Sequence, residues 1–388
     1  DNRQNKCLDI INFGIIPYEY RIQRPQHLAR ELTKLGNRAF YIESEFTFSA
    51  RPIDPQIEVT RKAENLYTVK LASSKNYFIY NDTPSSKDKK ILLSSLKLLL
   101  KEAHIINPVA KIDHPFWASI AEELGMPIVY DVMDLHSGFK ENSSDNLLKE
   151  NDLLKKADII LSSSDYLSYQ FRKYSSKMLS FKNAGEYKHF AESSKKLKAI
   201  PTDIKHLSGP VIGYYGALAD WLNTDLIEQL AKDFPHASIV LIGLVNNSHL
   251  LSLTDKYPNI HLLGEKPYTE LPKYLARFDV CLIPFKLNKL IQATNPVKIY
   301  EYFASGKPVV ATSIPELLPY NKLIYLADNP RRFSQKVKQA LAEKSVTLQQ
   351  QRRKIAQSNT WQDRAAALEK HLLKVLYPKV SVVILVYN

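Results

Sequence analysis

The chain has 388 residues, of which 45% are hydrophobic and 24% are charged. These values are typical of a globular protein and exclude a disordered or fibrous chain, and the length predicts two or three domains. The longest apolar run, residues 382–386, is far shorter than the roughly 18 residues that a membrane-spanning helix needs.

The formal net charge of +13 predicts attraction to an anionic partner. No nucleic-acid-binding motif is recognisable, so we expect no nucleic acid partner, and instead a phosphorylated small molecule or peripheral contact with an anionic membrane. The two cysteines, Cys7 and Cys281, lie in apolar, strand-like runs and are predicted to be buried hydrophobic residues. We therefore expect a cytoplasmic protein with peripheral contact at the inner face of the membrane.

Apolar, β-rich runs alternate with helical patterns over the first half of the chain. This alternation predicts a parallel sheet covered by helices, and we expect residues 1–195 to form one doubly wound, Rossmann-like domain. The predicted strands are 8–13, 38–42, 109–112, 128–130 and 159–161, and the predicted helices are 25–35, 87–103, 116–124 and 146–156.

A lysine-rich, polar stretch at 192–209 is typical of an interdomain linker. A second alternating series follows, so residues 208–345 are expected to form a second doubly wound domain. Residues 346–377 show a helical pattern, which we expect to form one long helix that straps the two domains together. Residues 378–388 begin a new strand pattern, expected to be the first strand of a further domain. The strands predicted for the second domain are 211–215, 238–242, 260–263, 280–284 and 308–311.

Open parallel sheets bind ligands beyond the carboxyl ends of their strands, where loops and helix starts leave backbone amides available. Two such domains, facing each other, predict a cleft between them. The segments directly after predicted strands are therefore the candidate ligand-binding segments.

A short helix near residues 296–306 has the sharpest pattern of this kind. Asn295 is predicted as its N-cap, a proline follows, and Gly306 is predicted to end it. The amides of Val297 and Lys298, with the lysine ammonium, are predicted to hold a phosphate. Glu301 could accept both hydroxyls of a ribose. The alternative is an ordinary capped helix with an exposed Lys and Glu pair.

A glycine-containing turn follows the predicted strand 211–215. At Gly216 and Ala217 the backbone could approach a diphosphate or a donor sugar closely, because glycine has no side chain. The alternative is a tight turn with close packing of strand and helix.

Polar side chains also follow predicted strands in the first half. Arg21 and Arg24 are predicted to contact substrate, unless they are solvated or paired with acidic neighbours. His114 and Asp134 are predicted to handle protons, and His136 to hold acceptor hydroxyls. A structural role in a turn or helix cap is the alternative, for Asp134 in particular. The spacing of these groups matches no zinc motif, so we predict no metal.

Four segments together resemble bacterial GT-B glycosyltransferases of the family 1 and family 4 type. They are residues 21–29, 130–134, 213–218 and 296–302, and they occur in that family's order. The resemblance implies two Rossmann-like domains facing across a cleft, with a nucleotide diphosphate sugar as donor in the second domain. It also implies a glycan or lipid-linked glycan acceptor and no cofactor besides the donor. The implied transfer is metal-independent and retains the configuration at the anomeric carbon.

In this resemblance Glu301 matches the second glutamate of a paired-glutamate motif, whereas the position of the first holds Ala293. The family's Arg and Lys after the glycine turn are also replaced, so donor phosphate binding would rely on Lys298, Lys286 and backbone amides. The implied function is sugar transfer, of hexosyltransferase type, in bacterial surface polysaccharide synthesis. Residues 378–388 resemble the first strand of GT-A family 2 enzymes, which implies a fused second transferase.

Two other functions stay open at this stage. A non-catalytic, GT-B-like carbohydrate-binding or scaffolding module is favoured by Ala293 and opposed by Lys298 and Glu301. A GT-B nucleotide-sugar epimerase would be distinguished by product formation without an acceptor.

Overall fold

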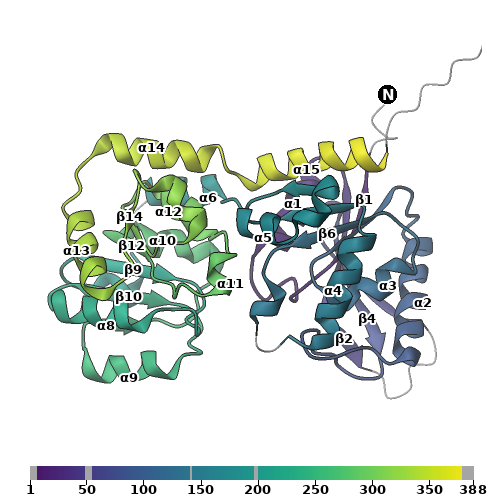
Figure 1. Ribbon diagram of the computed structural model, residues 1–388, viewed down its shortest axis with the longest axis horizontal. Coiled ribbons are helices and arrows are strands. Elements are labelled where there is room, and N and C mark those ends of the chain that lie inside the picture. Colours follow the sequence, from purple (N-terminus) through teal and green to yellow (C-terminus); the bar gives the residue numbers. More distant parts are fainter. Residues whose placement is uncertain (1–6, 49–54, 140–141, 196–199, 378–388) are drawn as a thin grey trace, which may run out of the picture. The chain divides into compact units, whose positions relative to one another are not determined.

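A computed structural model describes residues 7–48, 55–139, 142–195 and 200–377 (Figure 1). The chain forms two compact units, each with its own parallel sheet and covering helices. We call them unit 1, which comprises Asp1–Ser162, Phe171–Phe181 and Trp361–Asn388, and unit 2, which comprises Ser163–Gln170 and Lys182–Thr360. The expectation that two such domains face each other across a cleft stays a prediction.

The sheet of unit 1 has eight strands in the order β3-β4-β2-β1-β5-β6-β7-β8. Only β3 is antiparallel to its neighbour, and β1 and β6 are buried along their whole length. The predicted strands 8–13, 109–112 and 128–130 are confirmed, with small changes at their ends. The strands are β1 (Asp9–Phe13), β2 (Arg38–Phe48), β3 (Ile57–Ala63), β4 (Leu66–Ser73), β5 (Pro108–Ile112), β6 (Ile128–Val132), β7 (Ile159–Ser162) and β8 (Met178–Ser180).

The helices of unit 1 begin at side chains that suit helix starts. Ser85 caps α2 by accepting a hydrogen bond from the Asp88 amide, and Ser143 caps α4 through the Asn146 amide. The helices predicted at 25–35, 87–103 and 146–156 are confirmed. The helical segments are α1 (Arg24–Lys34), α2 (Ser86–Glu102), η2 (Pro115–Trp117), α3 (Ala118–Glu122), η3 (His136–Gly138), α4 (Ser144–Lys156), η4 (Arg172–Lys177) and α15 (Trp361–Leu376).

The sheet of unit 2 has six parallel strands in the order β11-β10-β9-β12-β13-β14. All five predicted strands are present, and β14 is additional. The strands are β9 (Val211–Tyr215), β10 (Ser238–Ile242), β11 (Ile260–Leu262), β12 (Val280–Ile283), β13 (Val309–Ala311) and β14 (Tyr325–Leu326). The helical segments are α5 (Asp165–Gln170), α6 (Tyr187–Lys195), α7 (Thr202–Lys205), α8 (Thr224–Asp233), α9 (Ser248–Lys256), η5 (Tyr268–Glu270), α10 (Leu271–Arg277), α11 (Lys289–Gln292), α12 (Lys298–Ser305), η6 (Pro315–Tyr320), α13 (Pro330–Leu341) and α14 (Val346–Gln357).

The boundaries between the two units do not fall in the predicted linker, residues 192–209, because the described residues of that stretch lie within unit 2. A buried carboxylate, Glu316, explains why earlier segments belong to unit 2. It accepts hydrogen bonds from the Asp165 amide and the Asn295 side chain, both at 2.7 Å. It also pairs with Lys182 at 3.1 Å. These contacts attach the chain on both sides of Phe171–Phe181 to unit 2.

The segment 346–377 was predicted to be one long helix, but it forms two helices. Residues 358–360 between them are not helical. The first, α14, packs on α12 of unit 2, and the second, α15, packs on α1 of unit 1. The strap between the two domains stays a prediction. Residues 378–388 lie outside the described residues, so the further domain stays a prediction too. No described helix is long and apolar enough to cross a membrane. Cys281 is buried as predicted, but Cys7 is exposed.

Two arginines of α14 hold the carboxyl end of α12. Arg352 donates to the Gly306 carbonyl at 3.2 Å, and Arg353 donates to the Ser305 carbonyl at 3.0 Å. Both cations lie where a helix dipole favours positive charge. Gly306 ends α12, as predicted from the sequence, and has the left-handed conformation with φ of 80°. Arg352 is itself held by Glu343 through two contacts of 2.6 Å.

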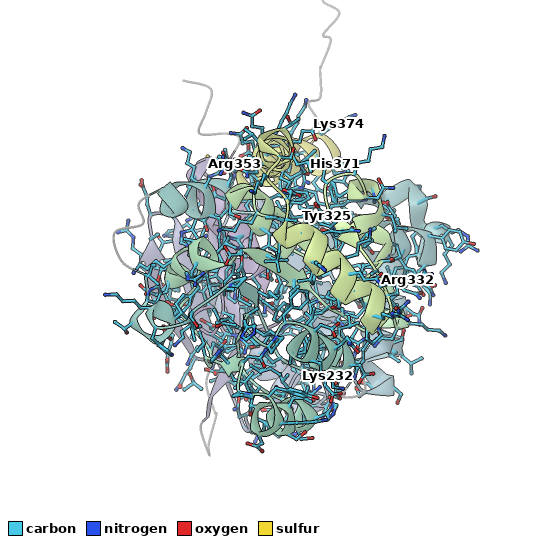
Figure 2. The ribbon with its side chains drawn as sticks, turned by 90° about the vertical axis from the view of Figure 1, so that its left-hand side faces the viewer. Lys232, Tyr325, Arg332, Arg353, His371 and Lys374 are labelled. Carbon is cyan, nitrogen blue, oxygen red and sulfur yellow. The ribbon has the colours of Figure 1, made fainter. Side chains whose placement is uncertain are left out.

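We expect Arg352→Leu to lower the free energy of unfolding by about 3 to 5 kcal/mol, because the Glu343 carboxylate would stay buried without its cation. Urea unfolding monitored by circular dichroism measures this loss. The control is Arg332→Leu on α13, whose exposed side chain is labelled in Figure 2 together with Tyr325 and Arg353. That variant should change stability by less than about 0.5 kcal/mol. Equal losses for both variants would contradict the assignment.

Candidate functional site

Three glycines mark the carboxyl edge of the sheet in unit 2. Gly216, Gly243 and Gly264 follow the neighbouring strands β9, β10 and β11, and their φ angles are 138°, 148° and 67°. A Cβ atom on Gly243 would lie 1.9 Å from the Gly216 carbonyl oxygen, so only glycine fits there. The sequence predicted a role for Gly216 but missed Gly243, although a glycine directly after a buried strand was the available signal.

The Lys298 side chain lies directly against the Gly216 turn. A Cβ atom on Gly216 would be 2.3 Å from Lys298 Cε and 2.6 Å from its Nζ. The same ammonium lies over the Tyr214 ring, 5.7 Å from the ring centroid. The structure therefore brings together two segments that were predicted separately to bind phosphate.

Glu301 lies one helical turn after Lys298 and is only 5% exposed. Burial raises the pKa of Glu301 to about 7, against the attraction of Lys298. The Tyr215 hydroxyl lies beside this carboxyl group, but it makes no hydrogen bond of standard geometry with any described residue. A buried hydroxyl without a standard hydrogen bond costs about 1 to 3 kcal/mol, which makes the Tyr215 hydroxyl, with Glu301 beside it, a candidate for ligand contact.

The start of α12 differs from the prediction. Asn295 does not cap the helix, which begins at Lys298 with Val297 in the cap position. The Asn295 side-chain oxygen instead accepts from the Asn183 amide at 3.2 Å, and its nitrogen donates to Glu316. The N-cap prediction was wrong because another segment uses this side chain, while a donor contact by Asn295 or Val297 stays a prediction.

The remaining predicted donor residues lie in loops at the same edge of the sheet. Ala217 follows Gly216 and is half-buried, and Lys286 is exposed in the loop after β12. The Lys286 amide donates to the Trp221 carbonyl at 2.8 Å, which joins that loop to the turn after β9. Ala293 is fully buried, and no carboxylate stands at that position.

A buried charge network lies at the carboxyl edge of the sheet in unit 1. Arg24, which is 4% exposed, donates to both oxygens of Asp131 at 2.8 to 3.1 Å. Lys111 pairs with Asp131 at 2.9 Å and also with Asp113. The alternative predicted for Arg24, pairing with an acidic neighbour, is confirmed. Lys111 and both aspartates were missed, although a lysine inside an apolar strand is itself a signal.

His114 and His136 form a buried pair beyond β5 and β6. Their rings meet edge to face, with centroids 5.0 Å apart. His114 Nδ1 accepts from the Phe116 amide, whereas His114 Nε2 and both nitrogens of His136 have no hydrogen-bond partner among the described residues. Burial lowers the pKa of His136 to about 4 and that of His114 well below its usual value. Both imidazoles are therefore neutral at pH 7.

Asp134 is the second residue after β6, lies between Asp131 and His136 in the chain, and is half-buried. Burial, with a contribution from Asp131, raises the pKa of Asp134 to about 6, although Arg24 acts in the opposite direction. A carboxyl group with this pKa suits proton exchange near neutral pH.

Arg21 is half-buried and lies over the Tyr20 ring at 4.7 Å. Within the described ranges, no three His, Cys, Asp or Glu side chains are grouped as metal ligands would be, and metal independence stays a prediction.

The Glu301 pKa predicts a pH-dependent stability. Its folded-state pKa of about 7 lies above the ordinary 4.5, so the folded state loses stability as the pH rises between these values. Glu301→Gln removes this cost, and the variant should gain up to about 3 kcal/mol over the wild type at pH 8 but little at pH 4.5. Urea unfolding at both pH values measures this. An equal gain at both pH values, or the same pattern in the exposed control Glu64→Gln, would contradict it.

Residues 209–343 match the family model described as Glycosyl transferases group 1. A Bacillus subtilis protein named as the teichuronic acid biosynthesis glycosyltransferase TuaH is 27% identical over 255 residues. This alignment covers 60% of the chain and 64% of that relative, so less than two thirds of the relative's length is matched.

Solved structures resemble the chain along nearly its whole length. Sucrose-phosphate synthase from Thermosynechococcus elongatus has a TM-score of 0.71 at 16% identity, covering 95% of this chain and 98% of that one. Anabaena HepE in complex with UDP and glucose has a TM-score of 0.65 at 15% identity, covering 94% and 99%. The catalytic domain of Arabidopsis thaliana starch synthase IV, bound to ADP and acarbose, has a TM-score of 0.69 at 11% identity, covering 95% and 99%. The chain therefore has the GT-B fold and carries a glycosyltransferase group 1 domain in unit 2.

Proposed function

We propose that the chain transfers a sugar from a nucleotide diphosphate sugar to a glycan or lipid-linked glycan acceptor in bacterial surface polysaccharide synthesis. The observation that carries this proposal is the Lys298 ammonium lying against the Gly216 turn, with Glu301 one helical turn later. The group 1 domain match and the name of the Bacillus subtilis relative support it.

In the proposed donor site, Lys298 and the amides at the start of α12 bind the diphosphate. A helix start favours anions, and these positive groups oppose the negative charge that develops on the departing diphosphate. Glu301 accepts hydrogen bonds from the ribose hydroxyls, and Gly216 lets the phosphates approach the backbone closely. Metal-independent transfer with retention is part of the proposal, with Lys298 in the place of a metal ion.

In the proposed acceptor site, the groups after β5 and β6 of unit 1 contact the acceptor. The acceptor oxygen forms a bond to the anomeric carbon, the bond from that carbon to the diphosphate oxygen breaks, and Asp134 takes the hydroxyl proton. His114 and His136 are neutral and can hydrogen-bond sugar hydroxyls. Arg21 is the remaining candidate for acceptor contact, because the Arg24 guanidinium pairs with Asp131.

We expect Glu301→Ala to weaken UDP binding by about ten- to a hundredfold, the loss typical of hydrogen bonds to a charged group. Calorimetry with UDP, ADP and GDP identifies the nucleotide that binds, and its 2′-deoxy form tests the contact. The wild type should prefer the ribonucleotide, and the variant should bind both forms equally. A variant that keeps the preference would remove Glu301 from the ribose site.

Asp134→Asn should lower donor turnover by about 10²- to 10⁴-fold while leaving nucleotide affinity unchanged, because the carboxylate acts on the acceptor proton only. Release of nucleotide from the donor, with and without acceptor glycan, measures turnover. Asp152→Asn, at an exposed position on α4, is the matched control. A turnover equal to the wild type would leave Asp134 outside the reaction.

A non-catalytic carbohydrate-binding module is the second candidate, and the buried Ala293 is the observation that favours it. Such a module would bind acceptor glycan but release no nucleotide from any donor. A fused GT-A transferase, a cytoplasmic location and contact with the inner membrane face remain predictions of the sequence.

A further inference from the structure

The solvent face of α2 presents a row of lysines in unit 1. Lys87, Lys90, Lys97 and Lys101 are all exposed. At 3.6 residues per turn they fall within an arc of about 80°, along roughly 21 Å of helix. Figure 1 shows α2 on the outer side of unit 1. The opposite face of the helix is apolar and packs on β4.

This row lacks the counter-charges that accompany some lysines on other surface helices. Lys149 and Lys232 pair with carboxylates one turn away, at 2.6 and 3.1 Å. None of the four α2 lysine side chains forms an ion pair or hydrogen bond with a described residue, whereas the side chain of their neighbour Lys89 pairs with Glu123. A solvated helix face normally carries both positive and negative side chains. A row of lysines without ion pairs therefore indicates an anionic partner.

Exposed apolar side chains lie in the chain just before and just after the helix. Phe78, in the loop that precedes α2, is 55% exposed, and Ile106, three residues beyond its C-cap, is 79% exposed. Exposed apolar and aromatic side chains that accompany a basic helix are a feature of surfaces that meet lipid headgroups and the upper acyl region. A polyanion such as nucleic acid or an acidic glycan would make no favourable apolar contact with exposed aliphatic side chains.

We propose that this α2 surface, defined by the four lysines with Phe78 and Ile106, docks unit 1 on an anionic lipid bilayer. Each lysine near such a surface adds attraction that salt screens within about a Debye length. Docking would keep the acceptor groups of unit 1 near lipid-linked glycans. The proposal goes beyond sugar transfer, since lipid docking needs neither donor nor turnover.

The test is co-sedimentation of the whole chain with vesicles of phosphatidylglycerol and phosphatidylcholine, and with vesicles of phosphatidylcholine alone. We expect binding to the anionic vesicles only, and its loss at 0.5 M NaCl. Replacing the four lysines should weaken vesicle binding more than about tenfold. The replacements are Lys87→Gln, Lys90→Gln, Lys97→Gln and Lys101→Gln.

The control removes the same charge from exposed lysines elsewhere, through Lys205→Gln, Lys338→Gln, Lys344→Gln and Lys374→Gln. Equal weakening by both sets would overturn the proposal, because net charge alone would then explain binding. Binding to DNA or a soluble acidic polysaccharide, but not to vesicles, would also overturn it. Ile106→Ser gives a second measure, since it should weaken vesicle binding without changing net charge. Thermal unfolding confirms that each variant is folded, and UDP calorimetry reports separately on the proposed donor site.

Discussion

The candidate donor site depends on the contact between the Lys298 side chain and Gly216, which has no side chain of its own. A side chain at position 216 would displace the ammonium, and one at 243 would collide with the Gly216 carbonyl. The turns after β9 and β10 and the start of α12 must therefore fit together as one unit. Arg352 and Arg353 hold the other end of α12, so the helix is fixed at both ends and Lys298 lies against the turn.

Unit 1 fixes its candidate groups by a different means, through charges that neutralise one another inside the protein. Asp131 is shared by Arg24 from the start of α1 and by Lys111 from β5. Removing one member would leave an uncompensated buried charge, which is costly. The network therefore fixes the end of β6 relative to α1 and β5. Asp134 lies three residues after Asp131, and Arg24 and Asp131 of this network contribute to the pKa of its carboxyl group.

Local patterns predicted much of the fold, because buried strands and capped helices are encoded in short segments. Strands such as β9 and β10 were predicted at their observed bounds. The strand β3 was missed because all but the first of its residues are exposed and its apolar alternation stops after Val59. The pairing of Arg24 with Asp131 and the position of Lys298 on Gly216 join segments far apart in sequence. Such contacts follow from the tertiary structure and from no local pattern.

Two buried glutamates of unit 2 show how a structural carboxylate differs from a candidate ligand-binding one. Glu316 receives the Asp165 amide, the Asn295 side chain and the Lys182 ammonium, so its charge is matched by donors from the protein itself. Glu301 has Lys298 as its attractive charge, and burial dominates enough to raise the pKa of its carboxyl group to about 7. Stability alone favours donors that match such a carboxylate, as at Glu316. A strongly perturbed carboxyl group beside a cation that rests on a glycine turn is instead the arrangement expected of a site that a ligand completes.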